Sequence, residues 1–342
     1  MIRICILLIG FLNFAAPDSW VEELEKEIEQ TEQSFSGNLS VYVKNLNDNQ
    51  TLNYKTDEFR YLASMIKIPV AIAILQKVEA DELSLDDSLV LKKSDFVDGA
   101  GDLLYEKPGA TFTLRDILLQ MIKNSDSVAT DMLIRLMGED NFNDHIHKHL
   151  SSDGIRPITT ILQVRYDAYN EIHPDVSTLS NMDIIRINGA STHAGRVEKI
   201  MELLDLSEND LKAKSIDEAF RRYYKSNLNS AKPETMGILL EDLYTGKLLS
   251  EKNTQFLLNA MQQITTGDDR IIAGLPDDFQ FAQKTGTQIK QMSNMGIIYK
   301  AEQEDNAPVI VVAFAENYDS QDEAEDIFRQ VGKLLSQTVL QE

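Results

Sequence analysis

Cysteine is nearly absent from this chain: Cys5 is the one cysteine among 342 residues. It lies inside an N-terminal stretch with the features of a secretory signal, in which Arg3 is followed by the almost wholly apolar residues 4–12. Ala15 and Ala16 supply small residues for cleavage, so we expect residues 1–16 to be a signal peptide. The mature chain then has no cysteine, which excludes a disulfide, a thiolate nucleophile and cysteine ligands for a metal.

Long apolar runs and positive charge are scarce as well. The N-terminal stretch is too short to span a bilayer, and no other segment approaches the roughly 18 apolar residues of a membrane-spanning helix. We therefore expect no membrane association after signal removal, and a secreted or periplasmic protein. The 33 basic residues are outnumbered by 55 acidic ones, which gives a formal net charge of -22. A surface this acidic repels the phosphate backbone, so a nucleic-acid partner is not expected.

The composition is that of a globular protein. Hydrophobic residues make up 43% of the chain, which is typical of a protein with a sizeable core. The length allows one large or two ordinary domains. The sequence contains no internal repeat, low-complexity stretch or linker rich in Pro, Gly and Ser, so we expect residues 17–342 to form one domain.

Residue periodicity predicts helices and strands in a particular order. Helical spacing occurs in residues 18–34, from residue 64 onward, within 113–150, and in 254–265 and 319–341. Strands are predicted at residues 38–46, 51–54, 278–283, 292–299 and 307–315. Strands at both ends of a chain, with helices between, are typical of an α+β fold with an antiparallel sheet. We expect the sheet part at about 17–60 and 266–342, and a helical part at about 61–265.

Ser64 and Lys67 form the only pair in which a lysine follows a serine by three residues. The apolar residues 68–75 follow them and predict a buried helix that begins near Ser64. That helix would place Lys67 on the same face as Ser64, roughly 5–6 Å away at Cβ. A serine hydroxyl needs a neighbouring base, and a lysine whose pKa is lowered by burial is such a base. One such pair is expected by chance in a chain of this size, so alone it decides nothing.

A second candidate is Ser125, 61 residues after Ser64, in the sequence Asn-Ser-Asp-Ser between two helical segments. A serine at such a junction can pass a proton to a leaving group. Short polar clusters between helices are more often helix caps, so this serine gains meaning only beside the other motifs.

A third candidate lies near the C-terminus, where Lys284, Thr285 and Gly286 end a predicted strand. The lysine brings a positive charge, the threonine a hydroxyl, and the glycine lets a substrate approach the backbone closely. Thr287 would offer its N–H as an oxyanion donor beside that of Ser64. A Lys-Thr-Gly sequence is expected roughly once in twenty chains of this length, so all three motifs in this order are not expected by chance.

Together the three motifs resemble those of the penicillin-recognising serine enzymes, in particular the class A β-lactamases. The spacing from Ser64 to Ser125, and residues 273–276 ahead of Lys284, are similar to class A. The resemblance covers most of residues 20–340. It implies a five-stranded antiparallel sheet flanked by the N- and C-terminal helices, plus an all-helical part, with the active site between the two.

Carried over residue by residue, the resemblance implies a catalytic set. Ser64 would be the acylated nucleophile and Lys67 its proton acceptor. Ser125 would protonate the leaving nitrogen with the help of Lys284. No metal or other cofactor is implied, and the expected partner is a small β-lactam or a cell-wall peptide.

On the substrate side, the resemblance implies that Thr285 and Thr287 bind the substrate carboxylate and carbonyl, with Gly286 allowing close approach. Many class A enzymes also use an arginine, either on the strand after the third motif or fourteen residues before its lysine. Residues 287–299 contain no arginine, whereas Arg270 lies fourteen residues before the motif lysine. Arg270 is therefore our candidate, and an ordinary surface arginine is the alternative.

Two departures from the class A pattern bear on mechanism. The second motif ends in Ser127 where the family has asparagine, so one amide contact to the substrate is absent or replaced by a hydroxyl. Class A enzymes also place a glutamate after the second motif, with an asparagine four residues later. Here Asp167 and Asn170 are one residue too close, and Glu171 follows the asparagine. No carboxylate is assigned by match, and we expect an insertion near residues 170–225.

The function we expect is a class A-like serine β-lactamase that confers antibiotic resistance through a Ser64 acyl-enzyme, with Asp167, Glu171 or Lys67 serving deacylation. Without a positioned water and a base, the acyl-enzyme would be long-lived. The alternatives are a D-alanyl-D-alanine carboxypeptidase, a slowly deacylating penicillin-binding protein, a related amidase such as a glutaminase and, from another class, a β-lactam sensor without turnover.

A metal-dependent reaction is the remaining alternative, because hydrolytic zinc sites also attack β-lactams. His145, His147 and His149 are the one histidine cluster in the sequence. On a helix, the first and third would share a face while His147 would point elsewhere. We interpret this cluster as a solvated helix end and expect no metal.

Overall fold

The structure, a computed structural model, describes residues 19–150, 153–300 and 308–341. The expected signal peptide with Cys5 lies outside these residues, as does the first residue of the strand expected at 307–315. Within the described ranges, no helix is long and apolar enough to cross a membrane.

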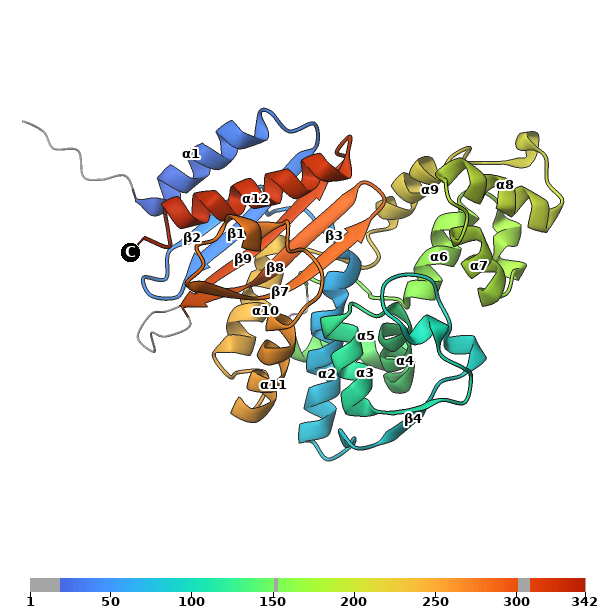
Figure 1. Ribbon diagram of the computed structural model, residues 1–342, viewed down its shortest axis with the longest axis horizontal. Helices are drawn as coiled ribbons and strands as arrows, with labels where there is room; N and C mark the ends of the chain where they lie inside the picture. Colours follow the sequence, from blue (N-terminus) through green and yellow to red (C-terminus); the bar gives the residue numbers. More distant parts are fainter. Residues whose placement is uncertain (1–18, 151–152, 301–307, 342) are drawn as a thin grey trace, which may run out of the picture.

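A five-stranded sheet, in which every neighbouring pair is antiparallel, forms the centre of the fold (Figure 1). Its spatial order is β2-β1-β9-β8-β7, and the strands are β1 (Asn38–Asn45), β2 (Thr51–Tyr54), β7 (Phe279–Gln288), β8 (Gln291–Lys300) and β9 (Val309–Glu316). Because β1 lies between β2 and β9, the N-terminal hairpin and the C-terminal third share one sheet. The expected α+β fold is confirmed.

The two terminal helices, α1 (Trp20–Glu32) and α12 (Gln321–Gln337), lie together on one face of the sheet (Figure 1). The hydroxyls of Ser19 and Ser320 cap their N-termini by accepting backbone N–H bonds. Every second residue of β1 and β9, beginning at Leu39, joins the apolar sides of these helices in one buried cluster. The expected flanking of the sheet by the terminal helices is therefore confirmed.

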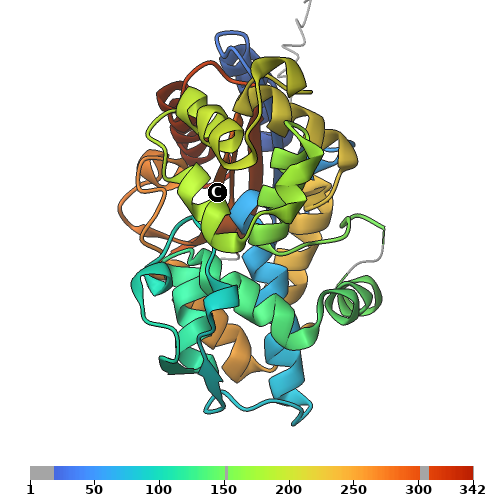
Figure 2. The ribbon, with the colours of Figure 1, turned by 90° about the vertical axis from the view of Figure 1, so that its right-hand side faces the viewer.

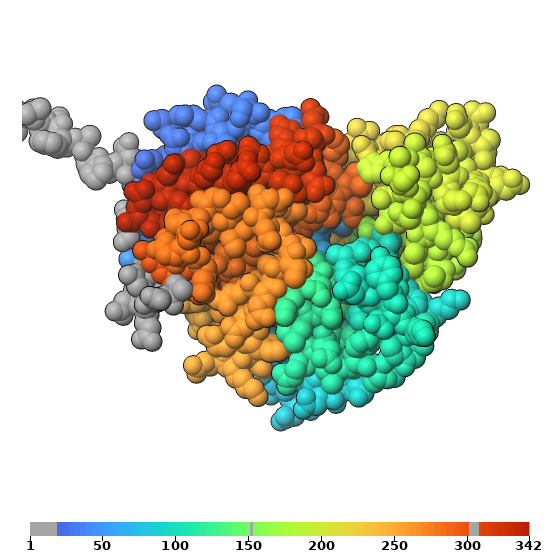
Figure 3. Space-filling model, in the orientation of Figure 1, coloured from blue at the N-terminus to red at the C-terminus, as the bar shows by residue number. Residues whose placement is uncertain are grey.

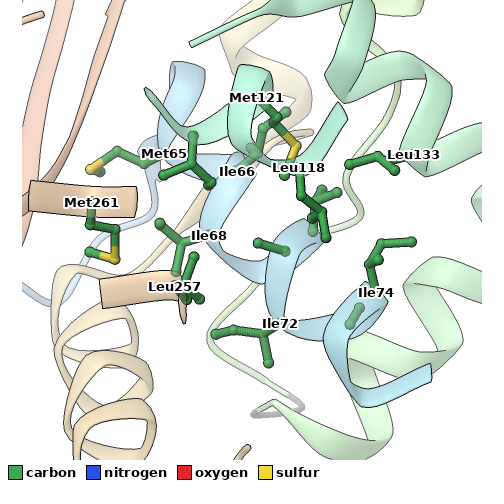
Figure 4. Close-up of a cluster of buried hydrophobic side chains, with 14 of the residues drawn as sticks. Met65, Ile66, Ile68, Ile72, Ile74, Leu118, Met121, Leu133, Leu257 and Met261 are labelled. Carbon is green, nitrogen blue, oxygen red and sulfur yellow. The ribbon is translucent and has the colours of Figure 1, made fainter. Parts of the chain in front are cut away.

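The opposite face of the sheet belongs to a second core, which surrounds α2 (Lys67–Glu79). Residues 67–75 of this helix are all buried, as expected of a helix that is apolar all round. The other helices of this part are α3 (Leu114–Lys123), α4 (Ser127–Met137), α5 (Glu139–His149), α10 (Pro233–Tyr244) and α11 (Glu251–Gln262). Figure 4 shows Ile68 and Ile72 of α2 in the same cluster as Leu118 from α3 and Leu257 from α11.

A third core lies in the segment that contains the expected insertion, and Figure 2 shows this group of helices facing the viewer. The group comprises α6 (Ile161–Asn170), η4 (Pro174–Thr178), α7 (Asn181–Asn188), α8 (His193–Leu204), η5 (Glu208–Asp210), α9 (Ile216–Tyr223) and η6 (Tyr224–Ser226). Its buried cluster includes Tyr169 and Phe220 together with Tyr61 and Ala63, which directly precede Ser64 in the sequence. This group of helices therefore packs against the segment that carries the first motif.

Periodicity did not predict the helices α6 to α10, which fall in the part expected only to be helical, and it did not predict the shortest elements. They are β3 (Arg60–Tyr61) with β6 (Ser230–Ala231), β4 (Ser88–Val90) with β5 (Thr111–Thr113), and the 3₁₀ turns η1 (Ala63–Ile66), η2 (Lys93–Asp95), η3 (Leu103–Tyr105) and η7 (Ile271–Gly274). Strands of two or three residues are too short to show a period, and a distant partner determines them. The helix expected from Ser64 also differs, because Ser64 lies in η1 and the α-helix begins at Lys67.

Candidate active site

Ser64 lies half-buried in the tight turn η1, and Lys67 is fully buried at the start of α2. The Lys67 Nζ atom donates a hydrogen bond to Ser64 Oγ over 2.9 Å. Ala63, immediately before the serine, has φ 49°, a left-handed conformation that costs free energy in a residue other than glycine. Strain next to a hydroxyl that contacts a buried amine is typical of a functional site.

Ser125 joins this pair from the turn between α3 and α4. Its backbone is also left-handed, with φ 54°, while Asp126 after it caps α4 by accepting the Ala129 N–H at 2.8 Å. Lys67 Nζ donates to the Ser125 carbonyl oxygen at 2.6 Å and to Ser125 Oγ at 3.0 Å. With the bond to Ser64, these contacts use all three N–H bonds of the Lys67 ammonium.

Lys284 approaches Ser125 from the sheet. It lies fully buried on β7, and its Nζ donates to Ser125 Oγ at 3.0 Å and to the Thr285 carbonyl oxygen at 3.0 Å. Ser125 Oγ thus contacts both Lys67 and Lys284. When both of its lone pairs accept from lysines, its own proton is directed elsewhere, which suits a hydroxyl that donates a proton to a substrate.

Gly286 allows β7 to lie against η1. A Cβ atom at this position would stand 2.7 Å from the Leu62 carbonyl oxygen and 2.4 Å from Ser293 Oγ, so any side chain would push the strand away from Ser64. The glycine thus holds Lys284 and Ser64 at the same site.

Arg270 is buried, with 5% of its surface exposed, and bonds to the third motif. It donates from Nη1 to the carbonyl oxygens of Gly286 and Ser293, each at 3.1 Å, and from Nη2 to Thr287 Oγ1 at 2.6 Å. On the neighbouring residue of the strand, Thr285 Oγ1 lies 2.6 Å from Thr266 Oγ1. The two threonine hydroxyls are held in place before any ligand binds.

Burial dominates the electrostatics of the two lysines. It lowers the pKa of Lys67 to about 7, although the carboxylates of Asp126 and Asp131 oppose the shift. Burial also lowers the pKa of Lys284 well below its ordinary value, and the positive charges of Lys67 and Arg270 add to the effect. Near neutral pH a large share of Lys67 is therefore the neutral amine, which is able to accept a proton.

Ser64, Ser125 and the two threonines of the third motif line a cleft of about 230 Å³. Its lining residues are Tyr61, Ala63, Ser64, Gly99, Ala100, Ser125, Ser127, Ile161, Val164, Arg165, Thr266, Arg270, Thr285, Thr287 and Gln288. No aspartate or glutamate occurs among the described residues of this lining. Helix α6 forms one wall through Ile161, Val164 and Arg165, which share a face because they are three and four residues apart.

The two acidic candidates for deacylation lie outside this lining. Asp167 accepts a hydrogen bond from Gln163 Nε2 at 2.7 Å on another side of α6, and Glu171 is the residue that follows the helix. The charged residue of α6 that does line the cleft is Arg165, whose Nε donates a hydrogen bond to Asp98 Oδ2 at 2.8 Å. Sequence reasoning missed Arg165, although helical spacing from Ile161 would have indicated it.

The histidine cluster lies elsewhere, on α5. The rings of His145 and His149 stand 4.5 Å apart, and His145 Nε2 lies 2.6 Å from Gln76 Oε1. In the part of the chain that the structure describes, no group of three or more His, Cys, Asp or Glu side chains is arranged to hold a metal.

A family model and two curated relatives that match this sequence all indicate the β-lactamases. A sequence model described as the β-lactamase enzyme family matches residues 23–339. Beta-lactamase VEB-1 of Pseudomonas aeruginosa is 23% identical over 83% of this chain and 79% of that protein. Beta-lactamase CTX-M-97 of Escherichia coli is 22% identical over 85% of this chain and 80% of that protein.

Two solved structures have a similar fold. The extended-spectrum β-lactamase TLA-1 superposes with a TM-score of 0.70 at 22% identity, covering 94% of this chain and 100% of that one. PBP-A superposes with a TM-score of 0.68 at 19% identity, covering 94% and 97%. Both likenesses support the fold described above.

The pH dependence of stability tests the environment of Lys67. The unfolded chain keeps this proton up to about pH 10.5, whereas the folded chain loses it near pH 7. Between these values the unfolded state binds more protons, so the free energy of unfolding rises with pH. Relative to a Lys67→Met variant, wild-type stability should rise by up to about 1.4 kcal/mol per pH unit from pH 7 to 9, measured by urea unfolding. Parallel curves for the two proteins would contradict a buried amine, and Lys77→Met on the same helix is the control.

Proposed function

We propose, from the premise that this chain belongs to the β-lactamase enzyme family, that it hydrolyses β-lactam amides through an acyl-enzyme on Ser64. The observation that carries the proposal is the position of Lys67 Nζ, which contacts the Oγ atoms of both Ser64 and Ser125. Two hydroxyls on either side of a buried amine give a proton a path from nucleophile to leaving group. The similarity to Beta-lactamase VEB-1 supports the same reaction.

Acylation begins when neutral Lys67 accepts the proton of Ser64 while Ser64 Oγ bonds to the β-lactam carbonyl carbon. The electron pair of the carbonyl moves to its oxygen, which the backbone N–H groups of Ser64 and Thr287 stabilise. The ring C–N bond then breaks, and Ser125 gives its proton to the departing nitrogen. Lys67 returns a proton to Ser125, so the amine is neutral again and the acyl ester remains on Ser64.

Lys284 assists through the hydrogen bond that its Nζ donates to Ser125 Oγ, which orients this hydroxyl for proton transfer. Thr285 and Thr287 both line the cleft, and we place the substrate carboxylate and carbonyl beside them. Arg270 already uses both Nη atoms in bonds to the protein. It therefore acts as a positioning residue for Thr287, while its charge attracts the carboxylate.

Deacylation requires a base that reaches a water molecule beside the ester. Of the three expected candidates, Asp167 and Glu171 lie outside the cleft lining, whereas Lys67 contacts Ser64 Oγ directly. We therefore assign this step to Lys67 in its neutral form. Because the described lining of the cleft holds no carboxylate to activate a water molecule, we expect deacylation to be slower than acylation, so that the acyl-enzyme accumulates during turnover.

The same lining favours a second candidate function, a D-alanyl-D-alanine carboxypeptidase that β-lactams acylate and inhibit. An acyl-enzyme that loses its ester slowly is inhibited by a β-lactam rather than turning it over. PBP-A shares the fold, and a variant of it is an acyl-enzyme complex with penicillin G. On this alternative the cleft would accept the carboxylate of a cell-wall peptide.

Rapid mixing with a chromogenic cephalosporin tests the order of rates. We expect a burst of about one equivalent of opened ring, followed by a slower linear phase, because deacylation limits turnover. The burst rate should increase as pH rises through about 7, the pKa of Lys67. A burst with no later hydrolysis would contradict a β-lactamase, and Ser64→Ala, which lacks the nucleophile, is the control.

Variants of the two acidic candidates test the assignment of the deacylation base. Asp167→Asn and Glu171→Gln remove the charges that sequence reasoning put forward, at positions away from the cleft. We expect each to keep the steady-state kcat within about twofold of wild type. A loss of about a hundredfold in either variant, with an unchanged burst, would identify that carboxylate as the base.

The second candidate has its own test, the release of D-alanine from a muramyl pentapeptide. If the protein is a β-lactamase as proposed, we expect no release above that of Ser64→Ala. Release that requires Ser64 and stops after addition of benzylpenicillin would instead establish the carboxypeptidase.

A further inference from the structure

A second hollow adjoins the catalytic cleft on the side of the insertion. It has a volume of about 370 Å³, and it shares Arg165, Thr287 and Gln288 with the lining of the cleft. The rest of its lining is Asn188, His193, Arg196, Asp217, Ile289, Lys290, Tyr318, Asp319 and Gln321. One wall therefore comes from the insertion, and the other comes from the β7–β8 turn and the residues that lead into α12.

Both walls are held in place by contacts within the protein. Tyr224, which follows α9, donates its hydroxyl hydrogen to the Ile289 carbonyl oxygen at 2.9 Å. The ring of Tyr61 packs on that of Tyr224 with centroids 4.9 Å apart. Lys290 Nζ in the turn donates to the carbonyl oxygens of Tyr318 and Asp319 at 2.8 and 3.0 Å. The hollow is consequently preformed rather than left between mobile parts.

Two of its cations lack a carboxylate partner. Among the ion pairs of the described residues, none includes Arg196 or Lys290. Among the described residues, Arg196 Nε is buried without a hydrogen-bond partner. The guanidinium group forms a hydrogen bond with the Tyr169 hydroxyl, which is uncharged and does not neutralise it.

The carboxylates in and beside the hollow form no ion pair with Arg196 or Lys290 among the described residues. Arg165 is neutralised by Asp98 at 2.8 Å, and Asp217 lies 2.8 Å from His193 Nδ1. Asp319 is exposed and forms no ion pair in the described chain. In a chain with 55 acidic and 33 basic residues, two neighbouring cations that form no ion pair among the described residues indicate an acidic ligand.

We propose that this hollow binds a carboxylate at the far end of the acyl side chain of the substrate, through Arg196 and Lys290. The proposal rests on the proposed function, which places the reacting carbonyl at Ser64 and Thr287. Lys290 follows Thr287 by three residues, in the turn that joins β7 to β8, so that the chain between them spans at most ~10 Å. A β-lactam whose side-chain carboxylate is separated from the amide by a spacer of about four carbons matches that reach. The preferred substrates are thus β-lactams with long anionic side chains.

The test compares two penicillins that differ in one charge. The first carries an adipyl side chain, and the second is its side-chain methyl ester. The second-order rate of Ser64 acylation is measured for each by rapid mixing and mass spectrometry, and their ratio is the readout. We expect wild type to prefer the free carboxylate by about tenfold or more, since a charge-assisted bond to an arginine is lost in the ester.

Variants of the hollow test whether it causes this preference for the free carboxylate. Arg196→Gln and, independently, Lys290→Asn should each bring the ratio towards one, and asparagine suits the left-handed backbone at 290, where φ is 54°. Arg186→Gln removes an exposed arginine of α7 that pairs with Asp183 outside the hollow, and it should keep the wild-type ratio. If one of these variants fails to fold, the rate ratios of the other variant and of wild type still show whether the preference depends on the hollow.

Three outcomes separate this inference from the proposed function. Equal acylation by the two penicillins in wild type would overturn the inference alone, and so would a ratio that neither Arg196→Gln nor Lys290→Asn changes. Failure of benzylpenicillin and of both probes to acylate Ser64 would overturn the proposed function and the inference with it.

Discussion

The burial of Lys67 is the constraint on which the rest of this structure depends. An ammonium group removed from water must find acceptors, and those it finds are Ser64 and Ser125, from two separate segments of the chain. Asp126 and Asp131 raise its pKa only in part, so the amine is left with a pKa of about 7. The loss of hydration that makes the ammonium form of this lysine costly to bury also favours the neutral amine, which is able to accept a proton.

The fold serves to bring three distant segments to that amine. Core packing around α2 fixes Lys67, the left-handed turn at Ser125 directs its oxygens towards Lys67, and β7 brings in Lys284. Gly286 allows the strand to approach closely enough. Helix α6 then completes one wall of the cleft, and this wall carries an arginine rather than a carboxylate among its described residues. The proposed slow loss of the acyl group rests on the absence of a carboxylate from the described residues of that wall.

Much of the fold was predictable because its elements are long and periodic. The terminal helices and the β1–β2 hairpin lie where apolar spacing predicts them, and the sheet formed from both ends of the chain is confirmed. The three motifs could be found from their order in the sequence. The contacts that join Lys67, Ser125 and Lys284 depend on tertiary structure, which the sequence motifs do not specify. The family pattern did not indicate Arg165 in the cleft wall, because it has a carboxylate in this stretch and Asp167 and Glu171 are the carboxylates near that position. The second hollow depends on how the insertion packs against the β7–β8 turn, which no local pattern specifies.

The most direct test of the account is mass spectrometry of the protein during exposure to benzylpenicillin, with peptide mapping of the adduct. The account predicts that one penicillin is added per chain, that the adduct lies on the peptide containing Ser64, and that it forms faster than it disappears. Ser64→Ala should remain unmodified. An adduct on any other residue, or steady hydrolysis of the antibiotic by Ser64→Ala, would contradict the account.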